Sequence, residues 1–261
     1  MGTAAAGTST AGLWRQAANV VGYVVVLTVN ALANALPING ITSGAVSDRF
    51  PTFVTPAGYV FAIWGVIYAL LAVFVGWQAL PLQRDDPRME RLGYAFVVSC
   101  VCNAAWLLAW HHLQIALAWA LIVTLLGALI ACYERLRGPT GGRLEWFAVR
   151  LPFSVYLGWV TVATVANTAI LGVDAGLDGG AAAPVWGAAA LLAATAIGLA
   201  MLFRREDVAF ALVLVWALIG IAVAQGPRSG VIVATTAVAC GALLAGIAVT
   251  AIRARTRGSP A

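Results

Sequence analysis

Eight long apolar stretches dominate this 261-residue sequence and restrict what it can fold into. Each is about 19 to 25 residues long, enough for a helix rising about 1.5 Å per residue to cross a hydrocarbon core of about 30 Å. They cover residues 17–36, 56–80, 91–110, 113–133, 149–172, 182–202, 207–225 and 229–251. Only 10% of the residues are charged, and a soluble domain with that composition would expose large apolar patches. We therefore predict an all-α membrane protein with about eight transmembrane helices.

The distribution of arginine predicts the orientation of these helices. The chain has 15 arginines and no lysine, and all but Arg49 and Arg228 flank the same side of the predicted spans. By the positive-inside rule, we expect both termini to be cytoplasmic, in an integral protein of a bacterial inner (plasma) membrane. The net charge of +5 follows from this orientation, so we expect membrane lipid as a partner and no nucleic acid.

The first span leaves two interpretations open. Arg15, an apolar run and the sequence Ala33-Asn34-Ala35 resemble a cleaved secretion signal. Cleavage would leave seven spans with the same arginine asymmetry, so charge does not decide the matter. The apolar run of about 20 residues is longer than the core of most signals, and we favour a retained helix.

Residues 55–68, TPAGYVFAIWGVIY, carry the most informative local pattern. Phe61, Trp64 and Tyr68 recur at positions i, i+3 and i+7, so they share one stripe of a helix. Close helix packing in lipid favours small residues, so this bulky stripe needs another reason. The stripe either fills a core or lines a flat, apolar cavity.

Polar side chains within the spans are predicted to meet at one depth. At about 1.5 Å per residue from the outer ends, Asn30, Asn103, Asn167 and Trp64 all lie about 8 to 12 Å deep. An amide that faced lipid would lack hydrogen-bond partners, so these groups should face inward. They act either as polar links between helices, which the spacing alone slightly favours, or as the rim of a ligand pocket under the loop 37–55.

Groups that could carry out chemistry are scarce in the spans. Charged residues occur only at span ends or in loops, which disfavours a proton- or sodium-coupled transporter. No pair of residues resembles a general acid facing a general base. The adjacent His111 and His112 are interpreted as a pair at the lipid–water boundary, with axial ligation of a haem as the alternative. We predict no catalytic residue and no metal site.

Three motifs together resemble the translocator protein family, also called tryptophan-rich sensory proteins or TspO/MBR proteins. The second helix of that family carries a proline, then Trp-Val-Phe, Trp and Tyr, which are matched by Pro56, Val60, Phe61, Trp64 and Tyr68, with Tyr59 where Trp is usual. The third helix carries N-x-x-W, matched by Asn103 and Trp106. The fifth carries W-x-x-x-A-x-x-x-N, matched by Trp159, Ala163 and Asn167.

The resemblance implies a five-helix ligand-binding bundle in residues 1–172, a lid formed by the loop 37–55, and a homodimer. Residues 173–261 have no counterpart in a five-helix family and are predicted to add three transmembrane helices and a basic tail. The implied ligand is a hydrophobic small molecule, a porphyrin or haem-like tetrapyrrole or a sterol-like compound, and no other cofactor is expected. The candidate ligand-binding residues are Asn30, Tyr59, Phe61, Trp64, Tyr68, Asn103, Trp106, Trp159, Ala163 and Asn167.

Three functions remain open at this point. The first is a membrane binding or sensory protein for a flat hydrophobic ligand. The second is an uncoupled transporter or facilitator of a small apolar metabolite. The third is an enzyme, because some members of the family are credited with light-driven breakdown of porphyrin.

Overall fold

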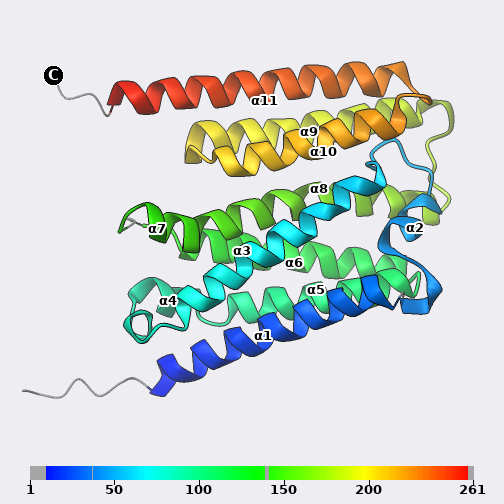
Figure 1. Ribbon diagram of the computed structural model, residues 1–261. Helices are drawn as coiled ribbons and strands as arrows, with labels where there is room; N and C mark the ends of the chain where they lie inside the picture. Colours follow the sequence, from blue (N-terminus) through cyan, green and yellow to red (C-terminus); the bar gives the residue numbers. More distant parts are fainter. Residues whose placement is uncertain (1–9, 37, 139–140, 258–261) are drawn as a thin grey trace, which may run out of the picture.

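The computed structural model describes residues 10–36, 38–138 and 141–257, which form helices and no strand (Figure 1). The long helices are α1 (Thr10–Ala35), α3 (Ile63–Gln78), α5 (Ala95–His111), α6 (Ile115–Arg135), α8 (Leu151–Asp174), α9 (Ala183–Arg205), α10 (Val208–Gln225) and α11 (Gly230–Arg257). In the described residues, seven segments are long and apolar enough to cross a membrane, and α5 is a shorter apolar helix. The predicted class, an all-α membrane protein, is confirmed.

The third predicted span is shorter than the sequence indicated. We expected it to begin at Arg91, but Gly93 has a φ of 55° and ends the short helix α4 (Pro87–Leu92). Glycine adopts this left-handed value without the clash that a Cβ would cause, so it commonly terminates helices. Helix α5 therefore begins only at Ala95, and its 17 residues rise about 25 Å.

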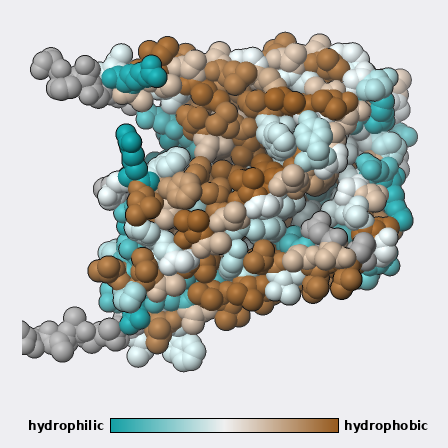
Figure 2. Space-filling model, viewed as in Figure 1, coloured by the Kyte–Doolittle hydropathy of each residue, from teal (hydrophilic) through white to brown (hydrophobic). Residues whose placement is uncertain are grey.

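The helices lie roughly side by side, with different short elements at the two ends of the bundle (Figure 1). Helices α9, α10 and α11 lie together on one side of α8, and α1, α5 and α6 lie on the other side. The short α2 (Ser43–Asp48) is at one end, which we call the α2 end. Helices α4 and α7 (Arg143–Glu145) are at the opposite end, which we call the arginine-rich end. Figure 2 shows hydrophobic residues across the middle of one face and hydrophilic residues at both ends, as a membrane-spanning bundle requires.

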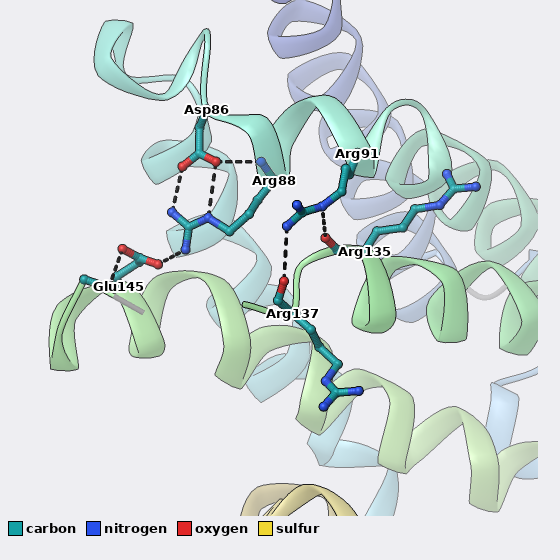
Figure 3. Close-up of polar contacts among 7 residues, drawn as sticks. Asp86, Arg88, Arg91, Arg135, Arg137 and Glu145 are labelled. Atoms are coloured by element: carbon teal, nitrogen blue, oxygen red, sulfur yellow. Dashed lines mark hydrogen bonds and ion pairs between the residues drawn. The ribbon is translucent and has the colours of Figure 1, made fainter. Parts of the chain in front are cut away.

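Ion pairs and hydrogen bonds connect the loops of the arginine-rich end (Figure 3). The Arg88 guanidinium contacts Asp86 at 2.7 Å and also pairs with Glu145 of α7. The neighbouring Arg91 donates hydrogen bonds to the carbonyls of Arg135 (3.4 Å) and Arg137 (3.2 Å), which end α6. Partial burial tends to raise the pKa of Asp86, but the hydrogen bonds from Arg88 prevail and lower it. This end is therefore a connected polar layer.

Helix α10 holds the segment that leads into α3. That segment includes a 3₁₀ helix, η2 (Gly58–Ala62), which precedes α3 directly. Three hydrogen bonds link it to α10, from Ala57 N to Gly220 O (3.1 Å), from Trp216 Nε1 to Val60 O (3.1 Å) and from Gln225 Nε2 to Thr55 O (2.9 Å). The C-terminal helices thus contact the most informative motif of the sequence directly.

A buried carboxylate fixes the other end of α10. Asp207 caps the helix by accepting a hydrogen bond from Phe210 N at 3.0 Å. Its second oxygen accepts hydrogen bonds from Tyr133 of α6 (2.8 Å) and Ser154 of α8 (2.7 Å). Because a buried charge is costly unless its hydrogen bonds are satisfied, this arrangement ties α10 to two helices of the N-terminal part. The division at residue 172 into two domains stays a prediction.

Candidate ligand-binding site

Three tryptophans from three helices meet toward the α2 end of the bundle. Trp64 of α3 lies 5.9 Å from Trp106 of α5 and 6.1 Å from Trp159 of α8, measured between ring centroids. Phe61 adds an edge-to-face contact to Trp159 at 6.0 Å. These separations are typical of aromatic rings in direct contact. The convergence expected from the sequence is present in the structure.

A layer of amides and phenols lies next to these rings. The Oδ1 of Asn103 accepts hydrogen bonds from Asn30 Nδ2 (3.0 Å) and from the Tyr68 hydroxyl (3.3 Å). The Nδ2 of Asn103 donates to the Tyr156 hydroxyl at 2.7 Å. All four residues are buried, and they come from α1, α3, α5 and α8. These amides therefore link helices, as one of the two sequence interpretations held.

Tyr156 was not among the residues identified from the sequence. It lies three residues before Trp159 on α8, so it shares the helical stripe of Trp159, Ala163 and Asn167. That spacing was the signal that could have identified it.

Asn167 makes a separate contact on the α2 side of the tryptophans. Its Oδ1 accepts a hydrogen bond from Trp106 Nε1 at 3.2 Å, and its Nδ2 donates to Ala163 O at 2.9 Å. The indole of Trp106 is thereby fixed against α8. Two of the three tryptophan-bearing helices are joined by this hydrogen bond.

A small cavity lies between these rings and α2. Its volume is about 30 Å³, and its lining consists of Ser47, Pro56, Phe61, Trp64, Trp106, Trp110, Trp159, Val162, Ala163, Ala166, Asn167 and Ile170. One water needs about 10 to 15 Å³ by this measure, so the cavity holds about two waters. The aromatic rings themselves fill most of the predicted pocket, and a flat ligand can enter only if they separate.

Among the four indoles that line this cavity, that of Trp159 has a buried N–H without a hydrogen-bond partner in the described residues. Its side chain is 2% exposed, and its Nε1 has no partner. By contrast, Trp106 Nε1 donates to Asn167 Oδ1 and Trp110 Nε1 donates to Ser43 O. A buried N–H without an acceptor costs about 1 to 3 kcal/mol. This donor therefore marks a place where an acceptor atom of a guest molecule would be stabilised.

Helix α2 covers the cavity and is held by the end of α5. Trp110 Nε1 donates to Ser43 O at 3.1 Å, and Ser47 lines the cavity directly. His111 contacts the same segment through both ring nitrogens, with Nδ1 donating to Ile38 O (3.1 Å) and Nε2 lying 2.9 Å from Ser43 Oγ. Ser47 is thus the residue of the predicted lid, 37–55, that lines the cavity; Pro37 is outside the described residues, and the action of the segment as a lid stays a prediction.

The interpretation of the two histidines was wrong for His111. We expected both at the lipid–water boundary, but His111 is 0% exposed and only His112 is exposed. His111 is buried because the loop before α2 and the first residue of α2 fold over it, each supplying a partner for one ring nitrogen. In the described part of the chain, no group of three or more His, Cys, Asp or Glu side chains could hold a metal ion.

Tyr59 does not lie with the other candidate residues. It is 48% exposed and makes an edge-to-face contact with Trp216 of α10, with ring centroids 5.5 Å apart. The reason is the 3₁₀ turn, in which each residue advances about 120° around the axis rather than the 100° of an α-helix. Tyr59 was a candidate only because of the resemblance, and in this turn it points toward α10 and not toward the tryptophans of the cavity.

The remaining candidates fall into two groups. Those lining the cavity are Phe61, Trp64, Trp106, Trp159, Ala163 and Asn167. Those in the neighbouring hydrogen-bonded layer are Asn30, Tyr68 and Asn103. Ligand contact by any of them stays a prediction.

The fold and the site together define a polytopic helical membrane protein with a tryptophan-lined cavity near one end of its bundle. A family model described as TSPO-like protein matches residues 16–250, and the chain belongs to this family. The match confirms the resemblance seen in the motifs, and it extends through α9 and α10 and over most of α11. No curated protein and no solved structure matches the chain.

Proposed function

We propose that this protein binds a flat hydrophobic ligand, a porphyrin or another tetrapyrrole, in the tryptophan-lined cavity under α2. The observation that carries the proposal is the buried and unpartnered Nε1 of Trp159 in the cavity wall. A tetrapyrrole offers a planar apolar surface for the rings, and its carboxylates and ring nitrogens offer acceptors for that indole. Small-molecule sites are typically such apolar cavities with few polar groups.

Binding requires the cavity to open, since about 30 Å³ admits only water-sized guests. Helix α2 has six residues, and Ser43 connects it to both Trp110 and His111. Displacement of this short helix would uncover Trp110 and give the ligand access to the indoles. We therefore expect a slow opening step before the ligand is bound.

The packing beyond the amide layer favours binding over passage through the bundle. Phe74, Phe96 and Phe153 are almost completely buried, with ring centroids 4.8 to 5.9 Å apart. They lie between the cavity and the arginine-rich end, on α3, α5 and α8. An uncoupled facilitator would need a path through this packed layer. In the proposal, the arginine-rich end and both termini face the cytoplasm of a bacterium, the α2 end faces outward, and the protein forms a homodimer.

The test is a titration of the purified full-length protein with protoporphyrin, followed by quenching of tryptophan fluorescence. We expect saturable binding that weakens at least tenfold in Trp64→Ala. Trp14→Ala is the matched control, because Trp14 is 71% exposed at the start of α1 and lies outside the cavity lining. Equal affinity of wild type and Trp64→Ala, or quenching that never saturates, would remove the proposed site.

Flux measurements separate the binding protein from the facilitator. In proteoliposomes loaded with protoporphyrin, we expect no more release than from protein-free vesicles of the same lipid with the same load. Release that depends on the protein and is abolished by Trp64→Ala would instead support the facilitator.

A further inference from the structure

A larger hollow lies between α8 and α9, separate from the tryptophan-lined cavity. Its volume is about 650 Å³, within the range of about 300 to 1,000 Å³ typical of small-molecule sites. Small side chains of α9, among them Ala190 and Ala193, face Val165 and Ala169 of α8 across it. We call this hollow the α8–α9 groove. The groove and the tryptophan-lined cavity are separate, because their linings share no residue.

The groove lies in the half of the membrane next to the α2 end. On α8 it runs from Thr164 to Val173, ten residues that rise about 15 Å, half of a hydrocarbon core of about 30 Å. The residues 51–54, which precede η2, close its end at the bundle surface. A groove of this length and depth matches the part of a bilayer that one leaflet occupies.

The groove wall is apolar even where threonine side chains line it. The hydroxyl of Thr164 donates to Val160 O at 2.7 Å, and that of Thr168 donates to Thr164 O at 2.8 Å. Both hydroxyl protons are therefore used within α8, and the wall offers methyl groups to an occupant. A hydrocarbon chain suits this wall better than a ligand that needs hydrogen bonds.

A positive charge lies next to the groove, against the outer side of its lining. Phe53 lines the groove, and the guanidinium carbon of Arg228 is 4.7 Å from the centroid of its ring. Arg228 Nη1 donates to Thr52 O (3.1 Å) and to Gln225 Oε1 (2.8 Å), two neutral acceptors. Arg228 makes no ion pair with any described carboxylate. Its guanidinium is therefore held in position by neutral acceptors and is not neutralised by an ion pair.

Two carboxylates lie near the groove and restrict where the negatively charged headgroup of a ligand can lie. Asp178 lines the groove and accepts a hydrogen bond from Gly180 N at 3.0 Å. Asp48 shares a smaller neighbouring hollow with Arg228. A headgroup must therefore bring its negative charge to the Arg228 side of the groove.

We propose that the α8–α9 groove binds one acyl chain of a membrane phospholipid whose phosphate contacts Arg228. The chain lies between the small side chains of α9 and the outer half of α8. The phosphate lies beside Phe53, where the guanidinium is held by Thr52 and Gln225. Arginine is well suited to this contact, because its fixed fork of N–H groups matches the geometry of phosphate oxygens.

The test is native mass spectrometry of the full-length protein in lipid-free micelles, with defined lipids added. The two probes are dioleoylphosphatidylglycerol and dioleoylglycerol, which share their acyl chains and differ in the phosphate-bearing headgroup. Ala190→Phe fills the groove, and Ala189→Phe is its control on an exposed position of the same helix outside the groove lining. Arg228→Gln removes the charge, and Arg49→Gln is its control at the same end of the bundle.

We expect one bound lipid per chain in the wild type. Ala190→Phe should lower occupancy by both lipids at least tenfold, whereas Ala189→Phe should not. Arg228→Gln should weaken binding of the phospholipid about tenfold and leave dioleoylglycerol unchanged, consistent with the loss of a charge-assisted hydrogen bond. Ala193→Leu repeats the groove test if Ala190→Phe does not fold.

Three results would overturn the assignment. Unchanged occupancy in both groove-filling variants would show that lipid binds elsewhere. An equal effect of Arg228→Gln on both probes would show that Arg228 recognises no phosphate. Displacement of the bound phospholipid by protoporphyrin would also contradict it, because the two sites would then be one.

Discussion

Gly220 of α10 lies directly against Val60 of the 3₁₀ helix η2, with no room for a side chain at position 220. A Cβ on Gly220 would overlap Cγ2 of Val60 and would lie 3.3 Å from Val60 Cβ. The Gly220 carbonyl also accepts the hydrogen bond from Ala57 N. The position of the segment before α3, and so of the aromatic rings that follow it, therefore depends on this approach.

Gly220→Ala is expected to destabilise the protein by about 1 to 3 kcal/mol, the range for an added group in a packed interior. Either Val60 must move or α10 must tilt away and lose its hydrogen bond to Ala57. Thermal unfolding in detergent measures the change. Gly65→Ala on α3 is the control, because a Cβ there meets no atom within 4 Å. A Gly220→Ala protein as stable as the Gly65→Ala protein would contradict the close contact.

Replacing two tryptophans of the cavity by phenylalanine is expected to reduce stability by different amounts. Trp106→Phe removes the hydrogen bond to Asn167 Oδ1, so it should cost about 1 kcal/mol or more. Trp159→Phe removes a buried N–H that has no partner, so its cost should be distinctly smaller. Unfolding midpoints of the two unliganded variants give the comparison. Equal destabilisation by both substitutions would show that the Trp159 N–H is satisfied after all.

The buried Asp207 network predicts a large effect far from the cavity. Asp207→Ala removes the cap of α10 and leaves the hydroxyls of Tyr133 and Ser154 without their acceptor. We expect a loss of about 2 to 4 kcal/mol. Asp178→Ala is the matched control, because its carboxylate is exposed and accepts one backbone hydrogen bond. Similar unfolding midpoints for the two variants would show that the network is dispensable.

The arginine-rich end predicts how acid affects stability. Because the pKa of Asp86 is lowered in the folded protein, its contribution is fully present above the ordinary value of 3.8 and is lost as the pH falls through the lowered pKa. Arg88→Gln should return that pKa toward its ordinary value and flatten the loss of stability between about pH 5 and pH 2. Arg137→Gln, which removes an exposed pair with Glu134, should leave the pH dependence as in the wild type. Identical slopes for wild type and Arg88→Gln would contradict the assigned role of Arg88.

The meeting of the asparagines and tryptophans was predictable because the membrane leaves them little choice. Asn30 and Asn103 cannot face lipid without losing their hydrogen bonds, so equal depth on neighbouring helices implies contact. Their hydrogen bond at 3.0 Å follows from that constraint. Tyr59 carries no such constraint, and its direction depends on a short 3₁₀ turn that the spacing of apolar residues does not reveal.

The role of α10 was not predictable from the sequence. Trp216, Gly220 and Gln225 reach residues more than 150 positions earlier in the chain, and no local pattern connects them. The small volume of the cavity was also not predictable, because residue spacing places rings on one face of a helix but does not show whether rings from different helices touch. Gly93 is a case that the sequence could have revealed, because glycine is a recognised residue at helix ends.

The affinity for protoporphyrin of wild type and Trp159→Phe tests the central claim most directly. The substitution keeps an aromatic ring in the wall and removes the buried N–H of Trp159, which has no partner. We predict that the dissociation constant rises about tenfold in Trp159→Phe, as expected for a lost hydrogen bond of about 1.4 kcal/mol, while the unfolding midpoint falls less than in Trp106→Phe. Equal affinity in the two proteins would contradict the claim that this cavity and its free indole form the binding site.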